Sequence, residues 1–470
     1  MLFPAVTRRL YAGLFLGLLP ALATGLAARG LGAQGPPDVR DSTRQARDSV
    51  SLSADSLLAR LARAEAAIAL LREQIANESE SAVHSRSRIH VELSAQVLTN
   101  AFATFGRVNN VDVPQTALAP PPAAATPPTK DATGITVRQS RFGAAASVTD
   151  VGGAVFSADV DFDLFGGVQN GPGDRRLFPE PRLRTTRARL TWKLTELMVG
   201  SETPLISDLN PLSLAAIGTP DFSAAGNLWN WLGQVRLTRE VGSTGPLRWA
   251  LQGAVMAPTA SQVAPGEPDA VDAGERSGRP AFEGRIRMRW GGDGADTEVG
   301  DAVIGHRSGE IGLGVHQGWV ATAPSTLVDS RALALDAHAV LARGIELRGE
   351  AYTGRVLRGL GGGGIAQNFG ATAPGAPAGA LGPPLRDVAG WAQLNVQPNP
   401  VLIAGIGCGM DLVNHNDNPT RLQNTVCALH AEWRPWMPLV IGAEYRQIGT
   451  RFSTGTFSAR HLNFVFGFEL

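Results

Sequence analysis

Three arginines alternate with apolar residues in one short segment beyond the middle of the chain. Arg285, Arg287 and Arg289 are separated by Ile286 and Met288, so a β-strand would place all three guanidinium groups on one face. A guanidinium group is a planar donor that matches the geometry of a carboxylate or a phosphate. A row of such groups facing water offers an anion several weak sites in succession, which permits fast passage. The spacing therefore predicts an anion-binding surface.

Other arginines fall on the same polar face of their predicted strands. These are Arg141, Arg187, Arg189, Arg236 and Arg348. An acidic row, Asp159, Asp161 and Asp163, belongs to the strand before Arg187 and Arg189, so we expect it to neutralise part of that charge. The strand before Arg285 has no such row, and its three arginines are predicted to be free to bind anions. A general polar lining without anion preference is the alternative.

No other pattern of chemically active residues is indicated. The eight histidines do not follow the spacing of metal ligands. The glycine-rich segment 359–364 has no surrounding strand–helix unit of the kind that binds nucleotides. Basic and acidic residues balance at 42 each, so no excess charge points to nucleic acid. We expect no enzyme, no cofactor and no metal, although a hydrolase built on the same fold is left open.

The two cysteines are predicted to face each other. Cys408 and Cys427 are equally far from a hairpin tip near residues 417–418, and equal offsets place residues opposite each other in an antiparallel pair. Export to an oxidising compartment would allow a disulfide between them. Two free thiols on the outer face of the strands are the alternative.

The elements that position these residues are sixteen short segments in which apolar and polar residues alternate. In the last of them, Leu462, Phe464, Phe466, Phe468 and Leu470 share one face. The predicted strands are residues 88–106, 135–148, 154–165, 182–193, 196–203, 230–240, 247–257, 280–290, 309–320, 330–341, 345–355, 386–397, 400–412, 421–433, 438–450 and 455–470. Long and short connections alternate along the chain. The exception is residues 291–308, which fall where a tight turn is expected but are too long for one. Apolar outside, polar inside and loops on one rim predict an all-β, 16-stranded antiparallel transmembrane β-barrel at residues 88–470.

The amino-terminal part of the chain differs from the barrel. Arg8 and Arg9 precede an apolar stretch that ends at small residues, which predicts a signal peptide at residues 1–33. Residues 50–77 carry apolar side chains in unbroken steps of four and three, the seam of a coiled-coil helix. A single amphipathic helix on another surface is the alternative. Residues 34–49 and 78–87 are linkers.

The connection at residues 204–229 is unusually apolar for a loop. It contains Leu205, Ile206, Leu209, Leu212 and Leu214. These side chains would be hidden from water if the segment folded into the barrel and narrowed it. Packing at a subunit interface would hide them equally well, and the sequence does not decide.

Several local patterns resemble the DcaP-like trimeric outer-membrane porins, a family related to phosphate-selective porins of the O/P type. They are Arg138-Gln-Ser-Arg-Phe-Gly, Met198-Val-Gly-Ser-Glu-Thr followed by Asp208 and Pro211, and Gly349-Glu-Ala-Tyr-Thr-Gly followed by Gln367. The chain departs from the family by ending in Leu470 where an aromatic residue is usual, and it lacks the lysine rows of the phosphate-selective porins. The resemblance implies a homotrimer with a periplasmic coiled coil and a preference for small anions such as dicarboxylates.

Together these observations predict a porin in the outer membrane of a bacterium, with the coiled coil in the periplasm. Its partners would be outer-membrane lipid and small anionic or polar solutes that diffuse through the arginine-lined lumen. A structural anchor that uses the coiled coil as a periplasmic tether is the alternative.

Overall fold

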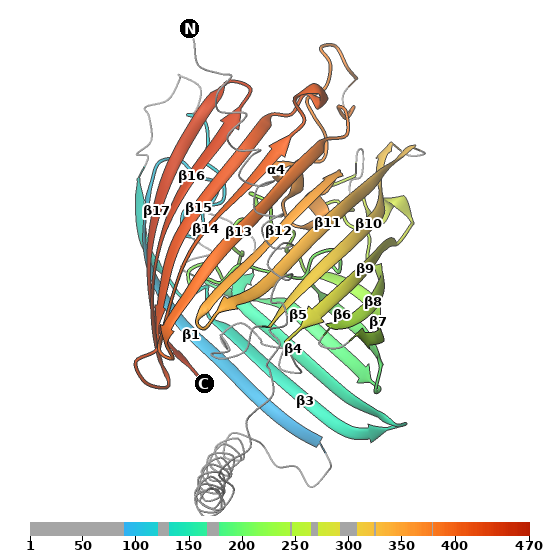
Figure 1. The fold of residues 1–470 in the computed structure, drawn as a ribbon. Helices are drawn as coiled ribbons and strands as arrows, with labels where there is room; N and C mark the ends of the chain where they lie inside the picture. The colour runs from blue at the N-terminus through green and yellow to red at the C-terminus, as the bar shows by residue number, and fades with distance from the viewer. Residues whose placement is uncertain are drawn as a thin grey trace, which may run out of the picture. The chain divides into compact units, whose positions relative to one another are not determined.

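The computed structural model describes residues 89–120, 131–166, 178–244, 247–264, 271–291, 308–323, 326–377 and 379–470. The predicted signal peptide, linkers and coiled-coil helix fall on residues 1–87 and lie outside this part of the chain. The described residues form an all-β antiparallel barrel, drawn in Figure 1. None of the helices in these ranges has the length and hydrophobicity of a transmembrane helix.

Consecutive strands are hydrogen-bonded to each other, except β2 and β3. The strands are β1 (Ile89–Phe105), β2 (Ala132–Thr136), β3 (Arg141–Val151), β4 (Ala154–Gly166), β5 (Glu180–Thr191), β6 (Thr195–Glu202), β7 (Leu232–Thr244), β8 (Leu247–Met256), β9 (Ala281–Trp290), β10 (Gly309–Ala323), β11 (Thr326–Ala342), β12 (Ile345–Arg355), β13 (Arg386–Asn399), β14 (Leu402–Val413), β15 (Arg421–Trp433), β16 (Leu439–Phe452) and β17 (Gly455–Glu469). Short helical turns are η1 (Glu275–Ser277), η2 (Arg358–Leu360), α4 (Gly363–Ala366) and η3 (His415–Asp417).

The barrel closes between its first and last strands and has sixteen wall positions. β1 pairs with β17 from Gln96 opposite Glu469 to Phe105 opposite Arg460. β1 also pairs with both β2 and β3, along different parts of its length. These two strands therefore lie end to end and share one wall position. The predicted sixteen-stranded antiparallel barrel is confirmed, but the strand predicted at residues 135–148 is broken between β2 and β3.

A side chain maintains the hydrogen bonding of the wall at this break. The backbone N–H of Leu98 donates to the Ser140 hydroxyl at 2.9 Å, and that hydroxyl donates to the Leu98 carbonyl at 3.1 Å. Serine is suited to this position because its hydroxyl both donates and accepts. The backbone hydrogen-bonding groups of Leu98 are thus satisfied on the edge of β1 where neither β2 nor β3 runs beside it.

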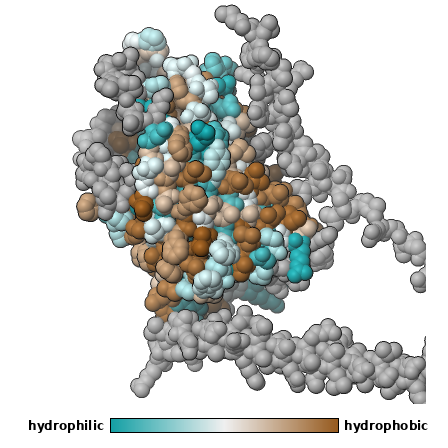
Figure 2. All heavy atoms as spheres, turned by 90° about the vertical axis from the view of Figure 1, so that its left-hand side faces the viewer, coloured by the Kyte–Doolittle hydropathy of each residue, from teal (hydrophilic) through white to brown (hydrophobic). Residues whose placement is uncertain are grey.

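The two faces of the wall differ as the alternation predicts. On β17, Phe464, Phe466 and Phe468 are exposed, whereas His461 and Asn463 are fully buried on the inner side. Figure 2 shows apolar side chains gathered on the outer surface that carries β16 and β17. Such a surface suits contact with lipid hydrocarbon, and the inner polar face suits water.

The connections lie on two rims of the barrel. One rim carries the ends of the long connections, whose described residues are 106–120, 203–231, 257–264, 271–280, 356–377 and 379–385, and the other carries tight turns such as residues 152–153 and 343–344. The connection at residues 291–308 does not alter the strand count, because Trp290 of β9 pairs directly with Gly309 of β10.

Candidate functional site

Residues 203–231, which connect β6 to β7, run inside the barrel. Leu205, Ile206 and Leu228 have no exposed surface and pack in one cluster with wall residues such as Met256 of β8 and Tyr352 of β12. The segment therefore hides its apolar side chains against the inner wall, which settles the choice that the sequence left open. Because the loop occupies part of the cross-section of the lumen, it narrows the passage through the barrel.

Side chains of distant strands hold this inward loop by hydrogen bonds. Leu212 donates its backbone N–H to Oε1 of Gln393 at 2.8 Å and accepts from Nε2 of the same side chain at 2.9 Å. The Ser213 hydroxyl donates to the Glu444 carboxylate. The loop thus reaches from the β6–β7 side of the barrel to β13 and β16.

Glycines allow the loop backbone to lie directly on the wall. Gly226 has a φ of +103°, and a Cβ atom there would stand about 2.4 Å from the backbone carbon of Gly390 in β13. Three wall positions away, a Cβ atom at Gly314 of β10 would stand 2.2 Å from the Ile206 carbonyl oxygen. No side chain fits at that separation, so the glycines set the position of the constriction.

The break between β2 and β3 points three consecutive side chains inward, which the sequence did not predict. Arg138 forms a buried ion pair with Asp112, its Nη2 lying 2.6 Å from the carboxylate. Gln139 donates to the Ala215 carbonyl at 3.0 Å and so binds the inward loop. With Ser140 bonded to β1, the Arg138–Ser140 segment joins the wall to two loops. In the sequence, a run of four polar residues, Arg138 to Arg141, interrupts the alternation at this point.

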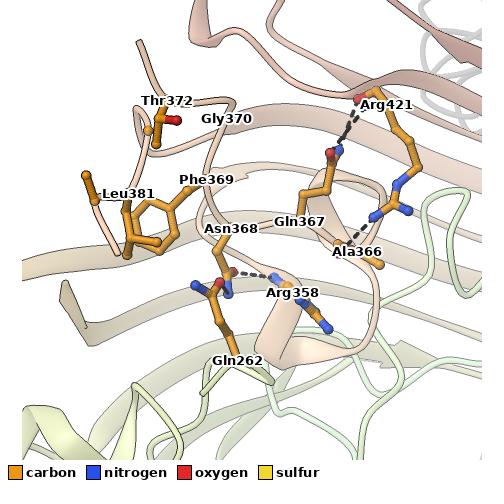
Figure 3. Close-up of a pocket in the computed structure, with 12 residues that line it drawn as sticks. Gln262, Arg358, Ala366, Gln367, Asn368, Phe369, Gly370, Thr372, Leu381 and Arg421 are labelled. Atoms are coloured by element: carbon orange, nitrogen blue, oxygen red, sulfur yellow. Dashed lines mark hydrogen bonds between the residues drawn. The ribbon is translucent and has the colours of Figure 1, made fainter. Parts of the chain in front are cut away.

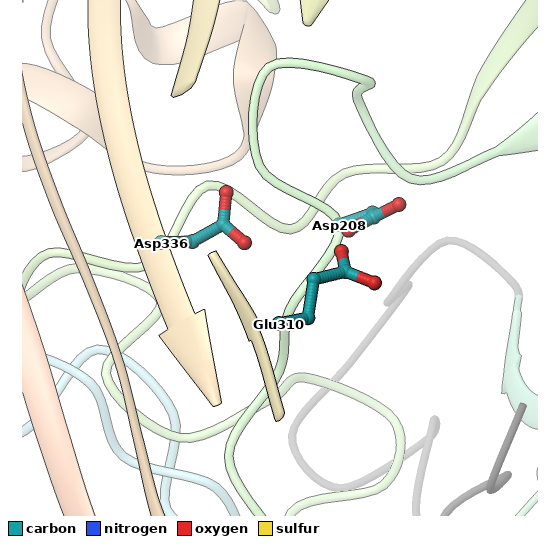
Figure 4. A group of neighbouring side chains, drawn as sticks. All are labelled: Asp208, Glu310 and Asp336. Atoms are coloured by element: carbon teal, nitrogen blue, oxygen red, sulfur yellow. The ribbon is translucent and has the colours of Figure 1, made fainter. Parts of the chain in front are cut away.

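Arg285 is fully buried among carboxylates. Its guanidinium binds Asp208 of the inward loop, Glu310 of β10 at 2.9 Å and Asp336 of β11 at 2.6 Å. Figure 4 shows the three carboxylates turned toward a common point. Their oxygen atoms lie within 4.8 Å of one another, close enough for a cation. The guanidinium supplies that positive charge, so the cluster is an ion-pair network of the constriction.

Arg287 and Arg289 are paired as well. Glu240 of β7 lies 3.2 Å from Arg287 and 3.4 Å from Arg289, and Glu310 lies 3.9 and 3.7 Å from them. The expectation that the arginines of β9 lack acidic partners is therefore wrong. The carboxylates come from the following strand β10, from β7 and β11 two positions away, and from a loop, whereas the sequence argument considered only the preceding strand.

The predicted neutralisation of β5 by the acidic row of β4 is present. Asp159 lies 2.7 Å from both Arg187 and Arg189, and Asp161 binds Arg141. In these pairs the arginine is the more exposed partner: Arg141 is 40% exposed against 9% for Asp161, and Arg189 24% against 17% for Asp159. Water in the lumen thus meets guanidinium groups along β3 and β5.

Around β9 the exposure is reversed. Glu240 is 30% exposed, whereas Arg287 is 14% exposed. Asp208 is 28% exposed, and Arg285 has no exposed side-chain surface. Water in this part of the lumen therefore meets carboxylates first. The cationic surface lies along β3 and β5 instead of along β9, where the sequence placed it.

A β-bulge adds two arginines that the sequence analysis missed. The register of β4 against β5 shifts at Arg184, whose Nε lies 3.3 Å from Asp161. The guanidinium groups of Arg184 and Arg182 stack on the Trp231 ring at 4.8 and 5.1 Å from its centre. A step of three before Arg187, where all other steps are two, was the signal of the bulge.

Arg236 and Arg348 hold the inward loop. Arg236 donates to the Thr203 carbonyl at 2.8 Å, and Arg348 donates to the Asn210 carbonyl at 2.9 Å. Arg348 also binds Glu346 of its own strand. Both arginines are inside the barrel as predicted. Their guanidinium N–H groups donate hydrogen bonds to backbone carbonyls of the loop.

Cys408 and Cys427 are directly opposite each other in β14 and β15, so the predicted register is confirmed. Their sulfur atoms are joined in a disulfide, with 4.1 Å between the Cα atoms and a sequence separation of 19 residues. They share the outer face with the exposed residues Ile406 and Leu429. The bond therefore lies on the outer side of the wall.

No family model matches the chain, and no curated protein matches it in sequence. Solved structures do match. OmpT of Vibrio cholerae aligns with a TM-score of 0.45 at 9% identity, over 83% of this chain and 100% of its own. An anion-selective porin from Comamonas acidovorans aligns with a TM-score of 0.47 at 11% identity, over 81% of this chain and 100% of its own.

The outer membrane channel DcaP of Acinetobacter baumannii aligns with a TM-score of 0.57 at 14% identity. The alignment covers 83% of this chain and 100% of DcaP. At this identity the similarity concerns the fold. The resemblance drawn from the local sequence patterns is thus confirmed at the level of the fold: the chain shares the barrel architecture of the DcaP channel.

Proposed function

We propose that the protein is a porin of the bacterial outer membrane that passes small polar solutes by diffusion. One observation carries the proposal: a closed barrel with apolar side chains outside and polar side chains inside, narrowed by an inward loop. A wall of this kind needs lipid on one face and water on the other. The shared fold with a channel protein supports the same function.

We further propose a preference for small anions such as dicarboxylates. The support is the cationic surface along β3 and β5, where Arg141, Arg187 and Arg189 are the more exposed members of their ion pairs or nearly equal to their partners. A partly exposed guanidinium group keeps donors free for a passing carboxylate. Because every one of these arginines also binds a wall carboxylate, the preference should be moderate and salt-dependent.

The proposal includes a signal peptide at residues 1–33 and a periplasmic coiled coil at residues 50–77 that joins three copies. The support is the sequence pattern of these segments. Apolar residues at both seam positions, without a buried asparagine, are compatible with a trimer.

Stepwise conductance in planar lipid bilayers tests the porin function. Purified full-length protein should give discrete current steps in potassium chloride. An absence of steps from protein that is folded by circular dichroism would contradict the proposal and favour a structural anchor.

Reversal potentials test the solute preference. Under a salt gradient, the sign of the potential shows whether chloride or potassium passes more readily. Replacing chloride by succinate on one side then shows whether a dicarboxylate competes for the same path. A reversal potential whose sign shows that potassium passes more readily than chloride would contradict the anion preference. The porin function would be unaffected by that result.

A further inference from the structure

A pocket of about 310 Å³ opens at the rim that carries the long loops. It is formed by the connection between β8 and β9, the connection between β12 and β13, and the first residue of β15. Figure 3 shows Arg358 and Arg421 at one end of this pocket and Phe369 and Leu381 at the other. The pocket is thus cationic at one end and apolar at the other.

The charges of the two arginines are not matched by carboxylates. Arg421 donates to the carbonyls of Ile365 at 3.0 Å and Ala366 at 3.2 Å, and no described carboxylate lies within 4.0 Å of it. The Arg358 guanidinium has neither a hydrogen bond nor an ion pair with any residue in the described ranges. Both arginines line the same pocket, so their positive charges repel each other. An anion placed between them would relieve that repulsion.

This arrangement differs from the rest of the inner surface. The arginines of β3, β5 and β9 that line the lumen all pair with wall carboxylates. The described residues that line the pocket include no carboxylate, and besides the two arginines their polar groups are backbone groups, side-chain amides and the Thr372 hydroxyl. Positive charge that is left unpaired in a concave site is what an anionic ligand requires.

Buried carboxylates fix the position of the pocket wall. Asp387 of β13 accepts from the backbone N–H of Gly364 at 2.5 Å, and Asp411 of β14 accepts from that of Ile365 at 2.9 Å. This holds the turn whose carbonyls bind Arg421. The Arg421 guanidinium is therefore oriented before any ligand arrives, which lowers the entropy cost of binding.

We propose that this pocket is a binding site for small organic anions. The carboxylate lies between Arg358 and Arg421, and the apolar part of the ligand lies toward Phe369 and Leu381. A role in drawing solutes to the barrel mouth rests on the proposed porin function, whereas the binding itself does not.

Calorimetric titration of the full-length protein in detergent tests the site. The probes are benzoate and its neutral analogue benzamide, with inorganic phosphate as an anion that lacks an apolar part. Benzoate should bind more tightly than phosphate, and benzamide should show no binding. The Arg358→Gln variant should weaken benzoate binding about tenfold or more, since it removes a charge-assisted contact. Arg358 has no side-chain partner in the described chain, so this variant should fold normally.

Arg451→Gln is the matched control. Arg451 is an exposed arginine near the same rim, at the end of β16, and is not part of the pocket. Its replacement removes the same charge and should leave benzoate binding unchanged. Equal losses in both variants would show a general effect of net charge and overturn the site, as would benzamide binding as tightly as benzoate. Bilayer conductance of the same preparations separates the proposals: conductance without benzoate binding contradicts only the site, and binding without conductance contradicts only the porin function.

Discussion

At the scale of single residues, the relative exposure of the two side chains in an ion pair decides which charge a solute meets. In the Arg141–Asp161 pair the guanidinium is the more exposed group, and in the Arg287–Glu240 pair the carboxylate is the more exposed group. Each pair is neutral as a whole. Charge counts along the strands cannot distinguish these two arrangements, yet they should favour opposite ions.

Two charge-neutral double substitutions should therefore have opposite effects on selectivity. Arg141→Gln with Asp161→Asn removes an exposed cation and a shielded anion, so the anion permeability relative to potassium should fall. Arg287→Gln with Glu240→Gln removes an exposed anion and a shielded cation, so the same ratio should rise. Reversal potentials measured at about 0.1 M salt, where the Debye length is about 10 Å, provide the comparison. Changes of the same sign in both variants would contradict the exposure argument.

A second residue-scale prediction concerns the loop between β14 and β15. The Arg386 guanidinium donates to Asp417 at 2.9 and 2.6 Å, and this hydrogen bonding holds the pKa of the Asp417 carboxyl below its usual value. A carboxyl with a lowered pKa in the folded state stabilises that state at neutral pH. The stabilisation is lost as the pH falls below about 4, through the folded pKa.

Amide hydrogen exchange of residues 414–420 measures this effect. At pH 7 the Asp417→Asn variant should exchange faster than the native protein. The difference should disappear once acid has protonated Asp417 in the native protein. A variant that exchanged like the native protein at pH 7 would show that the ion pair does not hold the loop.

At the scale of elements, the inward loop depends on backbone contact with the wall. Gly226→Ala would place a methyl group about 2.4 Å from the Gly390 backbone at a φ that L-residues rarely adopt. The strain should cost about 1–3 kcal/mol and move the loop away from β13. Single-channel conductance should change, while the strand content seen by circular dichroism should not. Gly449→Ala is the control, since a Cβ atom there meets nothing within 4 Å.

The hairpin of β14 and β15 carries a separate prediction. Mass spectrometry of unreduced, alkylated protein should recover one linked peptide pair that contains Cys408 and Cys427. Cysteine-to-serine replacement should lower stability by about 3 kcal/mol or less, because the cross-link closes a short loop. Two alkylated thiols in the native protein would contradict the bond.

At the scale of the whole molecule, the coiled coil at residues 50–77 is predicted to associate three chains. Leu61→Asp with Ile68→Asp would put charge into its apolar seam and should weaken association of the helices. Analytical ultracentrifugation of a peptide spanning residues 41–81 measures this without the barrel. The native peptide should sediment as a trimer and the variant as a monomer. A native peptide that stayed monomeric at high concentration would contradict the assignment.

The strands could be predicted because lipid and water impose opposite demands on alternate residues, as β17 shows with Phe464 outside and Asn463 inside. The cysteine register followed from hairpin symmetry alone. Two partners of Arg285 could not be predicted, because Asp336 lies two wall positions away and Asp208 arrives on a loop, whereas Glu310 lies on the adjacent strand β10. The same limit applies to the break before Ser140, whose hydrogen bond to β1 is not visible in a hydrophobic pattern.

The anchors of the inward loop also order the events of folding. Leu212 and Gln393 are 181 residues apart in the chain, and Ser213 and Glu444 are 231 apart. Contacts of such separation form late, because a long stretch of chain must already be fixed before they can be made. The loop therefore reaches its final place only after β13 and β16 are in the wall. Until then residues 203–231 expose their apolar side chains, so this segment is where a chaperone or protease would meet an unfinished barrel.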